Sequence, residues 1–202
     1  MLGDGAELLP PAAEQTFMGM PRPDESRRWT AVMVQALPAD GKRYEVVHGE
    51  LLVTPAPRPW HQEIVARLQE TLRAYLRREP VGVCLPSPAD LILDDMTLVQ
   101  PDLFVVDPVE ARTWAWEEFR TFLLVAEVTS PRTAARDRGV KRRRYQQHGV
   151  ATYWVVDPEA RLVEVWRPAD EAPAVERQRL VWHPVVAGEA MVVDLEELFR
   201  EE

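Results

Sequence analysis

The chain has 202 residues, of which 46% are hydrophobic, and this size and composition predict one α/β domain with its own core. Its net charge of −9 argues against a protein that coats nucleic acid by bulk electrostatics, but it is compatible with a local basic patch beside acidic metal ligands. The sequence has no run of about 18 apolar residues and no secretory pattern at its N-terminus. The single cysteine, Cys84, excludes an intrachain disulfide and a cysteine-based zinc site. We therefore expect a cytoplasmic protein that does not enter a membrane, with Cys84 as a buried structural thiol.

The N-terminal part predicts an arm followed by a helix. Residues 1–23 are rich in Pro and Ala and predict a loosely ordered arm, whereas residues 24–202 predict a single domain. Asp24–Ala36 predicts a first helix, with Asp24 as its cap.

A hairpin and a long amphipathic helix follow. Two β-prone runs, Arg43–Val47 and Glu50–Thr54, flank His48-Gly49 and predict the hairpin. Trp60–Arg78 predicts the helix, and His61 falls near the N-terminal end of its apolar face. The apolar residues that share this face are Ile64, Leu68, Leu72 and Tyr75.

The middle of the chain predicts strands and one connecting segment. The strongest strand carries the apolar run Phe122–Ala126, which does not alternate with polar residues, as expected for a central strand covered on both faces. Glu110–Glu118 predicts a connection with helical character. The strands expected here are Val81–Leu85, Asp90–Leu93, Asp102–Val106 and Thr121–Thr129.

A crossover helix is predicted after the strongest strand. Thr133 is expected to cap a helix that runs to about His148, and Gly149 is expected to end it. A helix of this length between two strands is typical of a β-α-β crossover, which makes the strands Thr121–Thr129 and Ala151–Asp157 parallel. The C-terminal part then predicts strands and a short helix at Leu162–Trp166, Arg179–Trp182, Met191–Val193 and Leu195–Phe199.

Two carboxylates are predicted to meet at one edge of the sheet. Glu127 lies at the C-terminal end of the buried strand, where an unpaired charge is costly. Asp102 precedes the apolar run Leu103–Val106. If the two strands are neighbours, both acids converge, and carboxylates with a main-chain carbonyl and waters are the ligands that Mg²⁺ accepts.

Lys141 is the third candidate. The chain has 24 basic residues, but only Lys42 and Lys141 are lysines. Asp137, Lys141 and Tyr145 are four residues apart and share one stripe of the predicted crossover helix. A lysine near the two acids can orient an attacking water or stabilise charge on a phosphate. The neighbouring arginines would give a basic rim suited to phosphates, and they are Arg132, Arg136, Arg138, Arg142, Arg143 and Arg144.

Structural explanations compete with each of these functional ones. A lone Asp at the start of a strand is usually a turn or cap residue. The pair Asp137–Lys141 is usually a surface ion pair worth a few tenths of a kcal/mol. A run of arginines is usually a solvated face, and Lys141 is also compatible with chance retention of a lysine. The order of the signals on adjacent elements favours the functional reading.

The sequence resembles the Uma2 family, a branch of the PD-(D/E)XK nuclease superfamily, from about Trp29 to the C-terminus. The matching residues are Arg43–Leu51, Pro55-Ala56-Pro57 with His61, Pro101-Asp102, Glu127–Pro131, Asp137 with Lys141 and Tyr145, Gly149-Val150 and Tyr153–Pro158.

The resemblance implies a restriction-endonuclease-like α/β fold, a mixed β-sheet flanked by helices, with an extra N-terminal helix and hairpin and C-terminal strands. It implies a metal ion held by Asp102 and Glu127. The position that carries the lysine in many superfamily members is Thr129 here, so Lys141 would supply the amine from the following helix. Glu50 and His61 match family positions and would complete the site, although a hairpin surface acid and a helix-start residue are the alternative interpretations.

Three hypotheses follow for the function. The first is hydrolysis of phosphodiester bonds in DNA with Mg²⁺, for which Mn²⁺ may substitute, held by Asp102, Glu127 and the Val128 carbonyl. In this hypothesis Lys141, Glu50 and His61 are catalytic. The residues expected to bind the substrate are Arg138, Arg142 and Tyr145. The second is an inactive nuclease fold that binds DNA or protein, and the third is a metal-dependent hydrolase of a small phosphorylated molecule. We also expect a homo-oligomer, since related nucleases dimerise to cut two strands.

Overall fold

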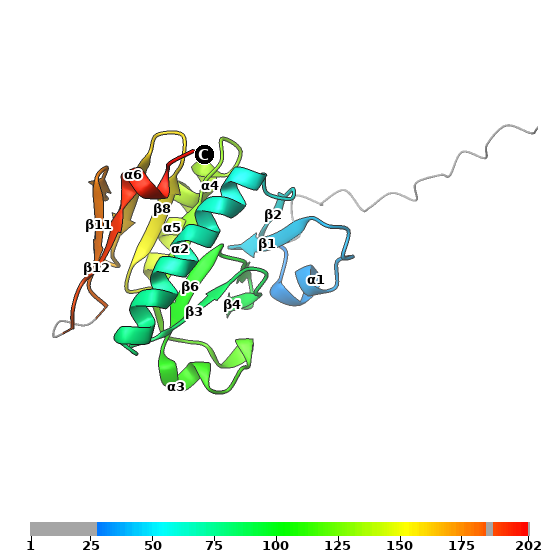
Figure 1. Cartoon of the computed structure of the whole chain (residues 1–202). Helices are drawn as coiled ribbons and strands as arrows, with labels where there is room; N and C mark the ends of the chain where they lie inside the picture. The colour runs from blue at the N-terminus through cyan, green and yellow to red at the C-terminus, as the bar shows by residue number, and fades with distance from the viewer. Residues whose placement is uncertain (1–27, 185–187, 202) are drawn as a thin grey trace, which may run out of the picture.

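A six-stranded mixed β-sheet forms the centre of the computed structural model, which describes residues 28–184 and 188–201 (Figure 1). The strand order is β10-β9-β8-β7-β6-β3. In this order the strands span Ala174–Glu176, Leu162–Trp166, Tyr153–Asp157, Phe122–Val128, Leu103–Val106 and Val83–Pro86. Within this sheet, β7 and β8 run parallel and the other neighbours run antiparallel. The condition that the strands of Asp102 and Glu127 are neighbours is met by β6 and β7, and the predicted parallel pair is confirmed.

The crossover between β7 and β8 is one continuous helical segment with three parts. These are α4 (Ala134–Arg136), a π-helical turn (Asp137–Lys141) and α5 (Arg142–Gln147). Thr133 is the N-cap residue of this helix, as predicted, but the expected side-chain cap does not form. Its side chain makes no capping bond, because its hydroxyl accepts a hydrogen bond from the Ser130 amide at 3.0 Å.

The long helix α2 (Pro59–Arg78) crosses one face of the central sheet, as Figure 1 shows. Its predicted apolar face is buried, because Ile64, Leu68 and Leu72 pack into the same core as β7. The same core includes the predicted C-terminal elements, which are β11 (Arg179–Trp182), β12 (Met191–Asp194) and α6 (Leu195–Leu198). The strands β11 and β12 pair with each other as a separate two-stranded sheet.

A second, four-stranded sheet has the order β2-β1-β5-β4. The predicted hairpin forms β1 (Arg43–Val47) and β2 (Glu50–Thr54), and β4 (Leu91–Asp94) and β5 (Thr97–Val99) complete the sheet. The strands β5 and β10, each of which has only three residues, were not predicted from the sequence. Residues of this second sheet pack on the opposite face of the central sheet, together with α5. Both faces of β7 are therefore covered, as predicted.

The first helix is shorter than predicted, and the connection between β6 and β7 is not one continuous helix. The helix α1 spans Ala31–Gln35, because the hydroxyl of Thr30 accepts a hydrogen bond from the Met33 amide and caps it. The predicted cap Asp24 and the predicted arm, residues 1–23, lie outside the described residues. The connection is divided into α3 (Pro108–Ala111) and a 3₁₀ turn at Trp116–Glu118.

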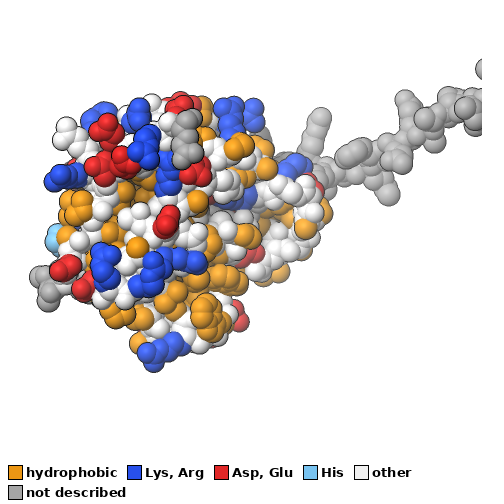
Figure 2. All heavy atoms as spheres, viewed as in Figure 1, with side chains coloured by type: hydrophobic (Ala, Val, Ile, Leu, Met, Phe, Trp, Pro, Cys, Tyr) orange, Lys and Arg blue, Asp and Glu red, His pale blue; other side chains and the backbone are white. Residues whose placement is uncertain are grey.

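The surface carries charges of both signs, and the single cysteine is buried as predicted. Figure 2 shows Lys and Arg side chains interspersed with Asp and Glu on the face that carries α2. Within residues 28–184 and 188–201, none of the helices is both long enough and apolar enough to span a lipid bilayer. Cys84 is buried, and burial raises the pKa of its thiol to about 12.

The turn of the β1–β2 hairpin requires glycine. His48 and Gly49 both have positive φ angles, 54° and 82°, which is typical of a two-residue turn that matches the twist of the strands. A Cβ at Gly49 would lie 2.9 Å from the Cβ of Arg28, whereas a Cβ at Gly41, where φ is 81°, would meet no atom within 4 Å.

We expect Gly49→Ala to lower the free energy of unfolding more than Gly41→Ala does. Both changes force an L-residue into left-handed backbone, at a cost of about 1–2 kcal/mol. Only the first also pushes a side chain against Arg28. Urea denaturation of the two variants measures the difference, and equal losses would show that the close approach is relieved without cost.

Candidate active site

Asp102 lies directly before β6 and is held by three donors. Its Oδ1 accepts a hydrogen bond from Arg43 at 2.9 Å, and its Oδ2 accepts one from the Val128 amide at 2.9 Å. The Nε2 of His61 lies 3.0 Å from the same Oδ2. Burial alone would raise the pKa of Asp102, but His61, Arg43 and the Val128 amide outweigh it and lower the pKa to about 2. Asp102 is therefore an ionised carboxylate although it is buried.

Glu127 lies on the neighbouring strand, near the C-terminal end of β7. Its Oε1 accepts hydrogen bonds from the Nζ of Lys141 at 2.6 Å and from the hydroxyl of Tyr145 at 2.9 Å. Burial raises the pKa of Glu127 to about 8, and nearby carboxylates, chiefly Asp102, add to this rise against the opposing charge of Lys141. The carboxylates of the site therefore carry more negative charge than the basic side chains beside them neutralise.

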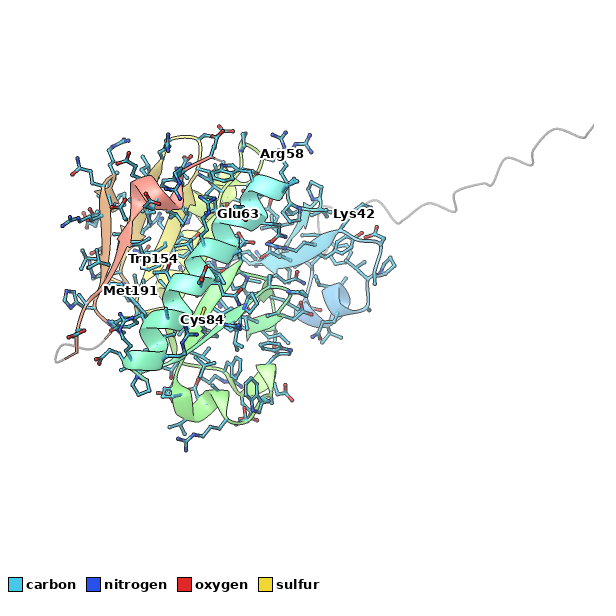
Figure 3. The ribbon with its side chains drawn as sticks, in the orientation of Figure 1. Lys42, Arg58, Glu63, Cys84, Trp154 and Met191 are labelled. Carbon is cyan, nitrogen blue, oxygen red and sulfur yellow. The ribbon has the colours of Figure 1, made fainter. Side chains whose placement is uncertain are left out.

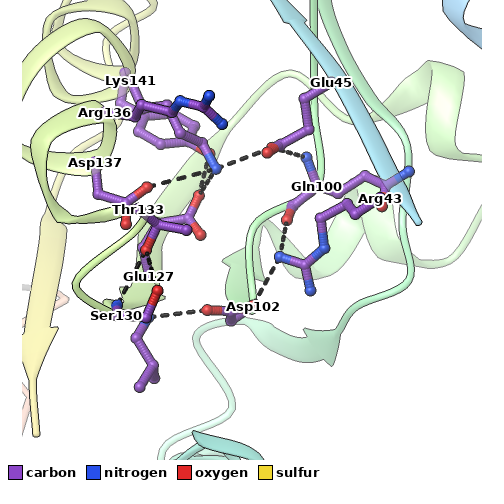
Figure 4. Close-up of polar contacts among 12 residues, drawn as sticks. Arg43, Glu45, Gln100, Asp102, Glu127, Ser130, Thr133, Arg136, Asp137 and Lys141 are labelled. Carbon is purple, nitrogen blue, oxygen red and sulfur yellow. Dashed lines mark hydrogen bonds and ion pairs between the residues drawn. The ribbon is translucent and has the colours of Figure 1, made fainter. Parts of the chain in front are cut away.

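Lys141 connects three parts of the fold. It comes from the π-helical turn, and its Nζ donates to Glu127 on β7 and, at 2.9 Å, to Glu45 on β1 (Figure 4). Asp137, one turn earlier, lies 4.0 Å from the same Nζ. We call Glu45, Glu127 and Asp137 around Lys141 the carboxylate cluster. Burial alone would lower the pKa of Lys141, but these three acids raise it above its usual range, so Lys141 is an ammonium.

Two buried tyrosines support the cluster from the far side. Burial raises the pKa of Tyr145 and of Tyr153 well above the usual range, so both phenols keep their protons. Tyr145 donates to Glu127, and Tyr153 donates to the main-chain carbonyl of Asp137 at 3.1 Å. Both phenols therefore fix the positions of acids that face the cavity.

A cavity of about 470 Å³ opens onto these side chains. Asp102, Glu127, Lys141 and His61 all line it, and Glu45 lies in the same wall. The loop that follows β7 forms part of its mouth, and the arginines that line it are Arg43, Arg58, Arg132 and Arg136. Figure 3 places Arg58 at the start of α2.

Comparison with known proteins identifies the family. Residues 31–196 match the model of the Uma2 family, described as "Putative restriction endonuclease". The chain belongs to the Uma2 family. A crystal structure of a "putative nuclease belonging to DUF820" from Anabaena variabilis ATCC 29413 is similar, with a TM-score of 0.68 and 16% sequence identity over 85% of this chain and 97% of that one. This likeness supports the restriction-endonuclease-like fold. No curated protein sequence matches the chain.

The Uma2 fold brings together most of the predicted site residues. Asp102, Glu127, Lys141 and His61 share one cavity, but Glu50 does not reach it. Glu50 is exposed at the hairpin turn, where it pairs with Val47.

Glu45 faces the cavity but was not among the site residues predicted from the sequence. The alternation of β1 was the available signal, because it puts Arg43 and Glu45 on the same face as the buried Val47.

The predicted substrate-binding side chains lie elsewhere in this Uma2 chain. Arg138 is held by Asp157 at 2.7 Å and by Glu164, and Arg142 lies over the ring of Trp166, 4.5 Å from its centroid. Tyr145 is buried behind Glu127. These three side chains stabilise the crossover helix against β8 and β9, so the proposal that they touch a substrate is not supported by their positions.

The residues present fit a divalent cation in their chemistry. Asp102 and Glu127 provide carboxylate oxygens from adjacent strands in one cavity wall, and such oxygens suit Mg²⁺. The buried acids of the site also outnumber its cations, the buried Lys141 and the half-buried Arg43. Among the described residues no three His, Cys, Asp or Glu side chains converge closely enough to hold an ion alone. An ion would therefore need main-chain carbonyls and water as further ligands.

We expect the stability of this Uma2 protein, measured with EDTA present, to fall as the pH rises toward about 8. The pKa values of Glu127 (about 8) and Asp137 (about 6) are raised by burial, so the folded protein binds protons that the unfolded chain has released. Glu127→Gln removes one such group and flattens the decline by up to about 1.4 kcal/mol per pH unit.

Denaturation at a series of pH values between about 5 and 8 measures this slope. Glu70→Gln, which changes an exposed acid of α2, is the control and should leave the slope unchanged. A slope equal to that of the wild type in Glu127→Gln would contradict the charge surplus at the site.

Proposed function

We propose that the protein is a Mg²⁺-dependent endonuclease that hydrolyses phosphodiester bonds in DNA, and that Mn²⁺ substitutes for Mg²⁺. The observation that carries this proposal is the meeting of Asp102 and Glu127 with Lys141 in the wall of one cavity. The family description supports a nuclease. Asp102, Glu127 and the main-chain carbonyl of Val128 would hold the metal ion. When bound there, the ion supplies Lewis-acid polarisation of the phosphate and lowers the pKa of a water.

Lys141 acts as a fixed positive charge in this proposal. Because its pKa is raised, its ammonium group donates hydrogen bonds and does not accept protons. A buried cation next to the reacting phosphate stabilises the negative charge that develops in the transition state. Thr129 stands at the position where many members of the superfamily carry a lysine. In this proposal Lys141 provides the missing amine from the crossover helix.

His61 is placed to assist the proposed metal ligand Asp102. Asp102 holds its Nε2, which orients the ring, while its Nδ1 is buried and has no hydrogen-bond partner among the described residues. Because its second nitrogen is buried, His61 acts in this proposal through Asp102, whose carboxylate it holds in place. Glu50 has no such position, so in this proposal the assisting group is His61.

The rim of the cavity supports a substrate with several phosphates. Arg58, Arg132 and Arg136, here called the rim arginines, line the cavity. None of the three forms an ion pair among residues 28–184 and 188–201, in contrast to Arg138 and Arg144, which are bound by acids. Arginines without acidic partners around a cavity are typical of contacts with a nucleic-acid backbone. A polymeric substrate accounts for them better than a small phosphorylated molecule does.

Asp102→Asn and Glu127→Gln are each expected to reduce Mg²⁺-dependent cleavage of DNA by at least about 100-fold, because each removes a charge from the proposed metal site. Supercoiled plasmid and short single-stranded DNA serve as substrates. Glu50→Gln is the matched control, since it changes an acid outside the cavity, and it should cleave as the wild type does. Cleavage that persists in a variant with both Asp102→Asn and Glu127→Gln would overturn the assignment of the site.

Arg58→Ala and Arg132→Ala are each expected to weaken the binding of DNA in EDTA and to reduce its salt dependence by about one phosphate contact. Fluorescence anisotropy with a labelled oligonucleotide at several salt concentrations measures both effects. Arg179→Ala, an exposed arginine on β11, is the control. Equal salt slopes in all three variants would show that DNA does not pass over the rim arginines.

A further inference from the structure

A second cavity of about 360 Å³ lies beside the first, between α2 and the loop that follows β3. Arg43, Asp102 and Pro57 line both cavities, so Asp102 faces both. The two cavities are therefore neighbours on either side of the Arg43–Asp102 ion pair.

The second cavity has polar groups without partners. Gln62 and Gln69 line it from α2, where a spacing of seven residues puts both on one face of the helix. Neither carboxamide takes part in the side-chain hydrogen bonds formed within residues 28–184 and 188–201. The hydroxyl of Ser87, on the opposite wall, is buried and also has no partner in this part of the chain. Gln62 is exposed and Gln69 is half-buried, so both carboxamides are free to bind a ligand, whereas the Ser87 hydroxyl is a buried group that lacks a partner.

The residues that line the rest of this cavity, apart from Arg43 and Asp102, are apolar. They consist of Val65, Ala66, Pro57, Pro86 and Pro88. A lining that combines apolar side chains with polar groups suits a small organic group with a hydrogen-bonding edge.

The charge of the cavity excludes a phosphate as its best ligand. Its cation is Arg43, which is already engaged by Asp102 and by the main-chain carbonyl of Gln100. Asp102 itself would repel an anion. Carboxamides, in contrast, both donate and accept, and a glutamine forms paired hydrogen bonds with the N6 and N7 edge of adenine.

We propose that this cavity is a subsite for one nucleobase of the substrate strand, adenine best, next to the phosphodiester bond that is cleaved. The proposal rests on the proposed nuclease function. A base in a paired duplex is stacked on its neighbours and cannot enter such a cavity, so the base has to be unpaired or turned out of the helix. The protein is therefore expected to prefer single-stranded or locally unpaired DNA.

The first test measures binding without cleavage, with the full-length protein in EDTA. Calorimetry compares deoxyadenosine 5′-monophosphate with deoxyribose 5-phosphate, which lacks the base. We expect the wild type to bind the nucleotide at least about tenfold more tightly. The double change Gln62→Leu with Gln69→Leu should abolish this preference, while Gln35→Leu, an exposed glutamine of α1, should keep it. Equal binding of both compounds by the wild type would overturn the proposal.

The second test uses short single-stranded oligonucleotides in which one position at a time lacks its base. We expect the loss of one particular base to weaken binding to the wild type, and to have little further effect in the double glutamine variant. If the variant weakens binding equally for all oligonucleotides, including those without the base, the base subsite does not exist.

These outcomes are separate from those of the proposed function. Base-dependent binding without any cleavage would retain the subsite and reject the nuclease. Cleavage that is lost in Asp102→Asn, combined with no effect of the glutamines on the base preference, would retain the nuclease and reject the subsite.

Discussion

The ammonium group of Lys141 is the interaction on which the rest of the site depends. A buried carboxylate without a partner costs several kcal/mol, and here acids from two sheets and one helix are buried together. Lys141 donates to Glu45 on β1 and to Glu127 on β7 while it is itself carried by the crossover helix. One cation therefore links the four-stranded second sheet, the central sheet and the crossover helix at a single point. The same contacts keep it charged and leave a surplus of acid, which is a suitable environment for a divalent ion.

Much of this centre could be predicted because its signals are local or follow from topology. Glu127 ends an uninterrupted apolar strand, and a strand-helix-strand sequence of this length gives a parallel pair with the helix returning over the strand end. That return brings Lys141 to Glu127, so two of the key residues follow from the pattern of one crossover. The position of Asp102 required one further condition, that β6 lies next to β7, which the sheet satisfies.

The remaining parts depend on contacts that no local pattern encodes. Glu45 and Glu50 lie on one face of the hairpin, because Val47 pairs with Glu50, and only the packing of the hairpin against the rest of the fold buries Glu45 and leaves Glu50 exposed at the turn. The arginines of the crossover helix looked equivalent in sequence, yet Arg138 is captured by acids of β8 and β9, while Arg136 faces the cavity. The side-chain cap at Thr133 does not form because Ser130 competes for the same hydroxyl. In each case a long-range or competing partner determined the outcome.

The contact between Glu45 and Lys141 also has a consequence for the way the chain folds. The two residues are far apart in sequence and belong to different sheets, so their contact closes a large loop of chain and carries a high entropic cost. Contacts of this kind form late, after local helices and hairpins. The cluster is thus complete only when both sheets have docked. A nascent or partly unfolded chain has the separate acids and the lysine but no assembled centre.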